Sequence, residues 1–167
     1  MVSDSTLRAS ALPSAWPQAP DITQDCGPYQ MRIVLAAHGL SVPIRCLQPT
    51  AWARGYTFPW RIPSLLKKWG GLAARTHVRV GRSALRAVAR DTLLRGRPLI
   101  VLIRATRGKH GVHWVSIWGY DEMRDACLVY DSQYENRVGG IGNIVYDTGL
   151  LSQHLPGRIL VAIEVRL

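Results

Sequence analysis

Three runs rich in β-branched and aromatic residues follow one another closely in the second half of the chain. RPLIVLIRAT occupies residues 97–106, GVHWVSIWGYDE residues 111–122 and ACLVYDS residues 126–132. Such runs are typical of β-strands, and the turn-like residues MRD between the second and third runs predict a hairpin. We therefore expect these three strands to be adjacent in one mainly antiparallel sheet.

The first half of the chain predicts helices that are interrupted by prolines. From Cys26 to Gly39, CGPYQMRIVLAAHG has apolar residues at helical spacing, a proline in its first turn and a terminal glycine. Short helical pieces are expected over residues 43–70 and an amphipathic helix over 83–96, with further strands at 72–80 and 158–167. Together with the sheet, these helices predict an α+β fold.

The length of the chain, 167 residues, suits one domain with a single sizeable core. Residues 1–21 are rich in Ser, Ala and Pro and predict an irregular N-terminal arm, which leaves residues 22–167 for the domain. Hydrophobic residues make up 47% and charged residues 19%, which is ordinary for a globular protein and argues against disorder or a coiled coil.

The formal net charge is +10, from 21 Lys and Arg against 11 Asp and Glu. A field of this size attracts polyanions, so an acidic partner or an acidic wall polymer remains open. The basic residues are spread along the chain rather than gathered in a block, and no nucleic-acid-binding motif is present, so nucleic acid is not a favoured partner. We interpret the stripe Arg82, Arg86 and Arg90 on the predicted helix as a solvated face.

Membrane and export signals are not evident in the sequence. No apolar stretch approaches the ~18 residues of a membrane span, and the N-terminus lacks a positive start followed by an unbroken apolar run. We therefore expect no membrane span, and a protein that is cytoplasmic or exported by a specialised route without such a signal.

The three cysteines, Cys26, Cys46 and Cys127, form no CxxC pair. They imply no zinc site and no disulfide framework, and we expect no metal or cofactor. Cys26 lies in TQDCGP at the start of the predicted helix, where unpaired backbone N–H groups and the helix dipole favour the thiolate. A structural cysteine would instead lie within an element among apolar neighbours. Cys26 is therefore a predicted nucleophile.

His113 begins one predicted strand and Asp131 ends the next. In a hairpin that turns near residues 123–125, these two ends of the strands come together. We expect Asp131 to accept the Nδ1–H of His113 and so to fix the tautomer that a general base requires. A cysteine, a histidine base and an orienting acid are what nucleophilic catalysis by a thiol needs. Trp114 and Trp118 would face away from His113 and are predicted core residues.

These residues lie in segments that resemble a known family. QDCGPYQMRIVLAAHG, GRPLIVLIRATRGKHGVHWVSIWGYDE, LVYDS and GNIVYDTGLL are similar to the papain-like peptidase domain that cuts bacteriocin leaders after double glycine, and to its free-standing bacterial relatives. The resemblance covers about residues 22–155 and keeps the order Cys26, His113, Asp131. It implies a papain-like fold, in which an N-terminal helix bearing the cysteine packs on the sheet bearing the histidine and the aspartate.

The family places an oxyanion-hole glutamine half a dozen residues before the nucleophile, where this chain has Pro20. Gln24 and Gln18 bracket that position, and either amide could donate to a developing oxyanion together with the Cys26 backbone N–H. Gln24 is nearer to Cys26 and is our predicted oxyanion donor.

The other histidines have weaker claims to a catalytic role. His110, in the loop RGKHG, is an alternative base in an expected mobile, solvated position. The remaining histidines have no predicted partner, and we interpret them as structural or exposed: His38, His77 and His154. Asp121 and Asn143 are alternative orienting residues.

Three functions remain open on the sequence. The first is a cysteine peptidase or amidase that cleaves a peptide or amide bond through an acyl-enzyme, with a peptide or protein substrate. The second is an acyltransferase or transglutaminase-like enzyme that passes the same acyl group to an amine. The third is a non-catalytic basic binding module.

Overall fold

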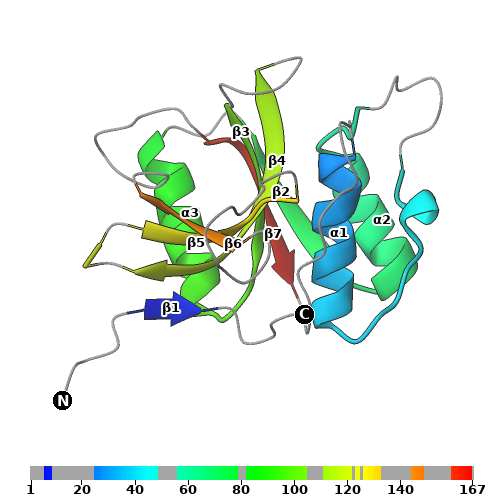
Figure 1. Cartoon of the computed structure of the whole chain (residues 1–167), viewed down its shortest axis with the longest axis horizontal. Helices are drawn as coiled ribbons and strands as arrows, with labels where there is room; N and C mark the ends of the chain where they lie inside the picture. Colours follow the sequence, from blue (N-terminus) through cyan, green and yellow to red (C-terminus); the bar gives the residue numbers. More distant parts are fainter. Residues whose placement is uncertain are drawn as a thin grey trace.

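The computed structural model describes residues 6–8, 25–48, 56–78, 82–104, 111–121, 123–124, 126–132, 144–148 and 159–166 (Figure 1). Its helices are α1 (Cys26–Ala37), α2 (Arg61–Gly70) and α3 (Arg82–Leu94), with a 3-10 helix η1 (Ile44–Cys46). Its strands are β1 (Thr6–Arg8), β2 (Ala73–Val78), β3 (Leu99–Arg104), β4 (Val112–Asp121), β5 (Ala126–Tyr130), β6 (Ile144–Thr148) and β7 (Ile159–Arg166).

All of these strands belong to one antiparallel sheet with the order β2-β7-β3-β4-β5-β6, and β1 pairs with β4 beside this path. The predicted adjacency of β3, β4 and β5 is confirmed. So is the hairpin between β4 and β5, whose turn includes Met123 and Arg124. The last strand in sequence, β7, lies inside the sheet between β2 and β3.

The N-terminal arm differs from the prediction at residues 6–8. These residues were expected to be irregular, but they form β1, in which Thr6 pairs with Asp121 and Arg8 with Gly119. The ladder with β4 supplies hydrogen bonds that the local Ser- and Pro-rich composition does not reveal. The other residues of the arm lie outside the described ranges.

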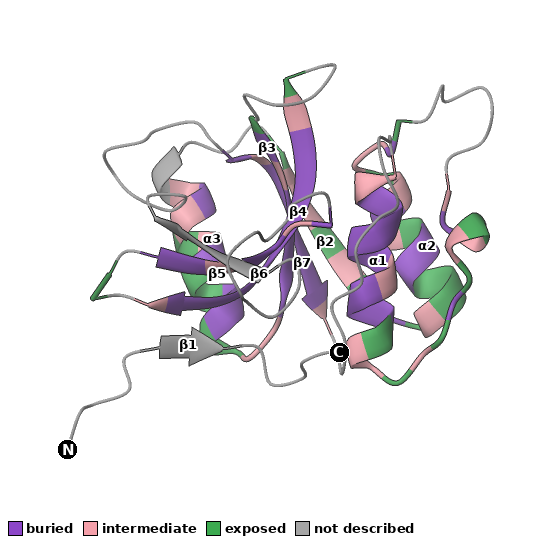
Figure 2. Cartoon of the chain, in the orientation of Figure 1, coloured by how far each residue is buried: buried purple, intermediate pink, exposed green. Residues whose placement is uncertain are grey.

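Helices cover both faces of the sheet. Figure 1 shows α1 and α2 on one side of it and α3 on the other. The buried residues accordingly form two cores, and Figure 2 shows buried positions along the strands between the helices. The first core joins α1 and α2 to the sheet through residues that include Met31, Leu35, Leu66, Trp118 and Ile163. The second joins α3 to it through residues that include Leu85, Leu93, Leu99, Val101 and Ile117.

Strand β4 contributes to both cores, because successive side chains of a strand point to opposite faces. Trp114 and Trp118 belong to the α1 side, whereas Val115 and Ile117 belong to the α3 side. The prediction that both tryptophans are core residues is confirmed, since Trp114 is 3% and Trp118 0% exposed. A central strand buried on both faces gives His113, its second residue, a fixed backbone position.

The helices end where glycines were expected to end them. Helix α1 stops at Ala37, two residues before Gly39, which has a φ of 74°. Helix α2 is capped by Gly71 at φ 65°, in the left-handed region that glycine adopts without steric cost. The helical pieces predicted over residues 43–70 correspond to η1 and α2.

Candidate active site

Cys26 is the first residue of α1 and is half-buried. The preceding Asp25 makes no side-chain capping bond to the helix; instead its Oδ2 accepts a hydrogen bond from the Nε2 of Gln48 at 3.1 Å. The first intrahelical bond runs from the Tyr29 amide to the Asp25 carbonyl, at 3.0 Å. The amides of Cys26 and Gly27 precede it, at the positive end of the helix. The sulfur therefore lies where a negative charge is favoured.

His113 lies near the start of β4 and is 8% exposed. Its Nε2 is 2.7 Å from Oδ1 of Asp131, the residue that follows β5. Ser116 pairs with Tyr130 across the two strands, so His113 extends beyond the end of β5 and its ring reaches diagonally to Asp131. The hairpin thus brings His113 and Asp131 together, as the sequence predicted.

The ring nitrogen that meets Asp131 differs from the prediction. We expected Nδ1, but the contact is made by Nε2, which donates its proton to the carboxylate. The direction in which the side chain leaves β4 decides which nitrogen reaches the acid, and strand patterns do not encode that torsion. Nδ1 is therefore the ring nitrogen left for other partners.

The Cys26 side chain also lies close enough to the His113 ring to raise its pKa. Burial of the ring disfavours its charged form, but the hydrogen bond and charge of Asp131, together with those of Cys26, outweigh burial. They raise the pKa of His113 from 6.5 to about 10. The imidazole is thus held between a carboxylate and a thiol, in surroundings that favour the imidazolium at neutral pH.

A chain of buried hydrogen bonds joins the helix that carries Cys26 to the strand that carries His113. Trp118 donates its Nε1–H to the Ser116 hydroxyl at 2.7 Å, and this hydroxyl donates to Oε1 of Gln30, also at 2.7 Å. Gln30 in turn donates from Nε2 to the Trp114 carbonyl at 3.3 Å. Gln30 and Ser116 are both 0% exposed. This link was not predicted from the sequence, although a glutamine one turn after Cys26 within an apolar helix was a signal for it.

The segment before α2 lies beside the same helix end. Trp114 donates its indole N–H to the carbonyl of Thr57 at 3.0 Å. The Thr57 side chain fills the space that a Cβ on Gly27 would occupy, since such an atom would lie 2.5 Å from Thr57 Cβ and Oγ1. Thr57 therefore contacts the residue after Cys26 and the residue after His113. Thr57 was not predicted from the sequence, because no local motif marks it.

The remaining predicted residues fall into two groups. His38 caps α1, with Nδ1 2.8 Å from the Val34 carbonyl, and His77 lies 3.6 Å from Glu164, so both have structural partners. Asp121 accepts hydrogen bonds from the backbone amides of Met123 and Arg124 in the hairpin turn, so its carboxylate is not the partner of His113. The others lie outside the described residues: Gln24, Gln18, Pro20, His110, Asn143 and His154.

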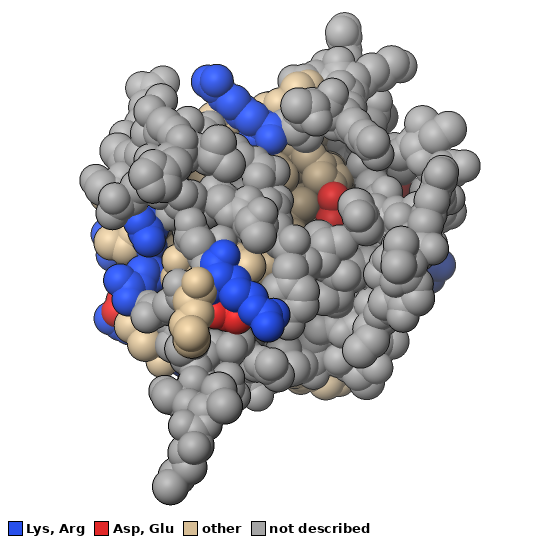
Figure 3. All heavy atoms as spheres, turned by 60° about the vertical axis from the view of Figure 1, so that its left-hand side comes forward, with Lys and Arg blue, Asp and Glu red and all other residues tan. Residues whose placement is uncertain are grey.

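The three cysteines are free. Within the described ranges no group of three or more His, Cys, Asp or Glu side chains is placed to hold a metal ion. The helices of the same ranges are all too short or too polar to cross a membrane. Figure 3 shows the described Lys and Arg side chains of one face in several groups, with acidic side chains near some of them.

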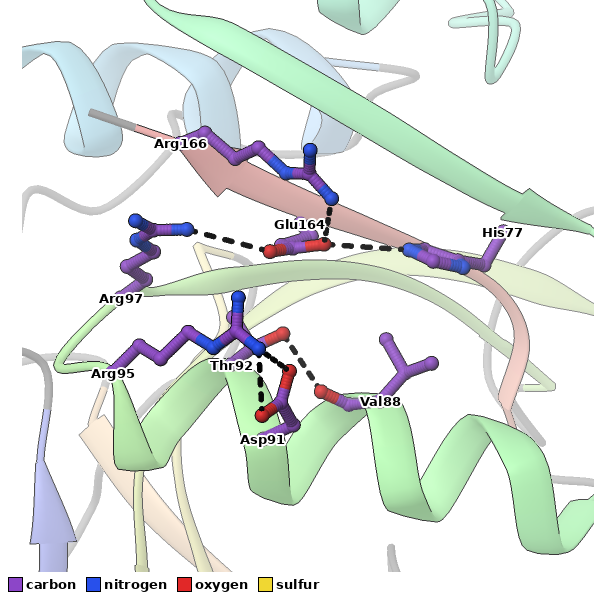
Figure 4. Close-up of polar contacts among 8 residues, drawn as sticks. All are labelled: His77, Val88, Asp91, Thr92, Arg95, Arg97, Glu164 and Arg166. Atoms are coloured by element: carbon purple, nitrogen blue, oxygen red, sulfur yellow. Dashed lines mark hydrogen bonds and ion pairs between the residues drawn. The ribbon is translucent and has the colours of Figure 1, made fainter.

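A second polar cluster lies at the other end of the sheet from His113 (Figure 4). His113 pairs with Ile103 at the end of β3, whereas Glu164 of β7 pairs with Leu99 at its start. Glu164 is 5% exposed and contacts three basic side chains: Arg166 at 3.2 Å, Arg97 at 3.5 Å and His77 at 3.6 Å. Burial alone would raise the pKa of Glu164, but Arg166 and His77 lower it below 4.5.

No family model and no curated relative matches this sequence, but solved structures resemble the fold. A C39-like peptidase from Bacillus anthracis aligns over 98% of both chains with 15% identity and a TM-score of 0.62. The peptidase domain of Streptococcus ComA, a bifunctional ABC transporter in a quorum-sensing pathway, aligns over 90% of this chain and 98% of its own, with 19% identity and a TM-score of 0.58.

A third similar structure is a double glycine motif protease from an AMS/PCAT transporter, in complex with the leader peptide. It covers 93% of this chain and 96% of its own, with 13% identity and a TM-score of 0.58. These similarities define the class: the chain has a papain-like cysteine peptidase fold. Within that class its fold is similar to that of the C39-like, double-glycine peptidase domains, which confirms the predicted α+β, papain-like architecture.

Proposed function

We propose that this chain is a cysteine peptidase with Cys26 as nucleophile, His113 as general base and acid, and Asp131 as orienting residue. One observation carries the proposal: the His113 ring bonds Asp131 at 2.7 Å, and Asp131 together with the nearby Cys26 raises the pKa of His113 to about 10. A thiolate beside an imidazolium that an acid holds in place is the state from which thiol catalysis begins.

The reaction follows from these positions. The Cys26 sulfur attacks the carbonyl carbon of a peptide bond, and the C–N bond breaks as His113 gives its proton to the leaving amine. The neutral imidazole then takes a proton from water, whose oxygen attacks the thioester; the C–S bond breaks, the acid is released, and the Cys26 thiolate and the His113 imidazolium are restored. The positive end of α1 stabilises negative charge on the carbonyl oxygen during both attacks.

The proposed substrate is a peptide. A double glycine motif protease with a similar fold binds a leader peptide. From that structure we take only the substrate class, a peptide. Peptides with small residues before the cleaved bond are the first sequences to test. The oxyanion donor proposed from the sequence is Gln24, whose amide would act together with the Cys26 backbone N–H.

Thiol alkylation tests the assignment of the nucleophile. Treated with iodoacetamide at pH 7 and mapped by mass spectrometry, Cys26 is expected to react faster than Cys46 and Cys127, of which Cys127 is 0% exposed. In His113→Ala, Cys26 should no longer react faster with iodoacetamide than Cys46. Equal reactivity of Cys26 and the half-buried Cys46 would contradict the proposal and favour a non-catalytic basic binding module.

Peptide cleavage tests the reaction itself. A library of peptides with small residues before the scissile bond should be hydrolysed by the wild-type chain and not by Cys26→Ala, whose thermal midpoint should stay close to wild type. Repeating the assay with added hydroxylamine tests for the acyl-enzyme, since a hydroxamate product forms only when hydroxylamine attacks the thioester in place of water. Cleavage that persists in Cys26→Ala would overturn the proposal.

A further inference from the structure

Thr57 holds a buried hydroxyl without a hydrogen-bond partner. The residue is 8% exposed, and its Oγ1 bonds no other group in the part of the chain that the structure describes. A buried donor left unpaired costs free energy, and proteins rarely keep one without a reason. Its own backbone is well anchored, because the Trp114 indole binds the Thr57 carbonyl at 3.0 Å. The Thr57 backbone is therefore held in place, while its hydroxyl is covered in the unliganded protein and has unused bonding capacity.

This hydroxyl lies at the end of α1 that carries Cys26. A Cβ on Gly27 would lie 2.5 Å from Thr57 Oγ1 and 2.7 Å from its Cγ2, so the side chain packs directly on the residue after the cysteine. The Cys26 and Gly27 amides are at the same helix end, which is a positive, donor-rich place. A group that binds there must supply acceptors, and the carbonyl oxygens of a peptide backbone are such acceptors.

We propose that Thr57 is a substrate-contacting residue: binding of the peptide that Cys26 attacks uncovers the Thr57 hydroxyl, which donates a hydrogen bond to a backbone carbonyl oxygen of that peptide. The inference rests on the proposed peptidase function and deepens it. A backbone contact is independent of the substrate's side chains, so it fixes the peptide's position without selecting its sequence. The free hydroxyl destabilises the unliganded protein slightly and is satisfied when the peptide binds.

The test compares two reagents that alkylate the same sulfur. Iodoacetamide needs only the thiol, whereas acetyl-dipeptidyl chloromethyl ketones also need the peptide site. With Gly-Gly, Ala-Ala and Phe-Ala as the dipeptides, Thr57→Val keeps the shape but not the hydroxyl and should slow all three ketones about tenfold, the loss expected for one hydrogen bond. The rate with iodoacetamide should stay at the wild-type value, and so should all rates in Thr57→Ser.

A matched control is available in α3. Thr92 is also buried, but its hydroxyl donates to the Val88 carbonyl at 2.7 Å (Figure 4). Thr92→Val should therefore lower the thermal midpoint and leave every alkylation rate unchanged. Thr57→Val should leave the midpoint equal or higher, because it removes an unpaired group.

The outcomes separate the two proposals. Wild-type rates for Thr57→Val with all three ketones would overturn the role of Thr57 and leave the peptidase proposal intact. A loss with one ketone alone would also overturn it, because a backbone contact acts on all three. Iodoacetamide alkylation of wild-type Cys26 no faster than that of Cys46 would instead overturn the proposed function.

Discussion

His113 of β4 meets Asp131 through Nε2, 2.7 Å from the carboxylate Oδ1, although Asp131 follows β5 and lies 18 positions further along the chain. The antiparallel pairing of β4 with β5 brings the start of β4 close to the end of β5. The His113 ring extends beyond the end of β5 and reaches the Asp131 carboxylate. Because Nε2 is taken by the acid, Nδ1 is the ring nitrogen left for Cys26, which also raises the pKa of His113.

Asp131→Asn should lower the pKa of His113. The hydrogen bond and the negative charge of Asp131 both raise this pKa, and an amide keeps a hydrogen-bond acceptor but no charge. The midpoint of His113 titration, followed by NMR of the ring, is expected to fall by about 1–3 pH units. An unchanged midpoint would show that Cys26 alone sustains the imidazolium.

The stability of the protein should fall as the pH rises from about 6.5 to about 10. The pKa of His113 is raised on folding from 6.5 to about 10, so the folded state holds a proton that the unfolded state releases in this range. The stabilisation is complete below pH 6.5 and is lost as the pH passes the folded value. Urea midpoints measured across this range should decline less in His113→Gln than in the wild type. Parallel declines would contradict the prediction.

Ser116→Ala should destabilise the fold by about 1–3 kcal/mol, the cost of leaving buried polar groups without a partner. The Ser116 hydroxyl serves both Gln30 and Trp118 at 2.7 Å. Urea unfolding measures the loss. In the double variant Gln30→Leu with Ser116→Ala, the cost should be smaller than the sum of the two single costs, because both ends of one bond are removed together. Additive costs would show that the bond contributes nothing of its own.

Glu164→Gln should cost about 1–3 kcal/mol of unfolding free energy, because a buried carboxylate loses its charge among three basic side chains. The pKa of Glu164 is lowered on folding, so its contribution is present above pH 4.5 and is lost as the pH falls below it. The variant should therefore lose less stability than the wild type on acidification. Cys26 alkylation should not change, since the cluster lies at the far end of β3.

Asp91→Asn is the matched control for Glu164→Gln. Asp91 and Arg95 form an ion pair of 3.0 Å on α3, and both side chains are more than half exposed (Figure 4). Removing a solvated pair of this kind should cost less than about 0.5 kcal/mol. Equal losses in the two variants would contradict the view that burial sets the value of the Glu164 cluster.

Local patterns were sufficient for most of the fold. Proline and glycine positions predicted the ends of α1 and α2, and β-branched runs predicted the neighbouring strands β3, β4 and β5. The prediction was wrong at residues 6–8, which form β1 through a ladder with β4. Pairing with a distant strand leaves no trace in three residues of sequence, so composition could not reveal it.

The sequence by itself determined the elements and the candidate chemistry. Helical spacing placed Cys26 at a helix start, and the hairpin brought His113 near Asp131, because both depend on neighbours along the chain. Only the tertiary structure decided the contacts between distant segments: Nε2 rather than Nδ1 facing the acid, Gln30 bonded to Ser116 across 86 positions, and the Thr57 hydroxyl unpaired beside Gly27. Those depend on side-chain torsions and on the packing of helix against sheet, which no local pattern encodes.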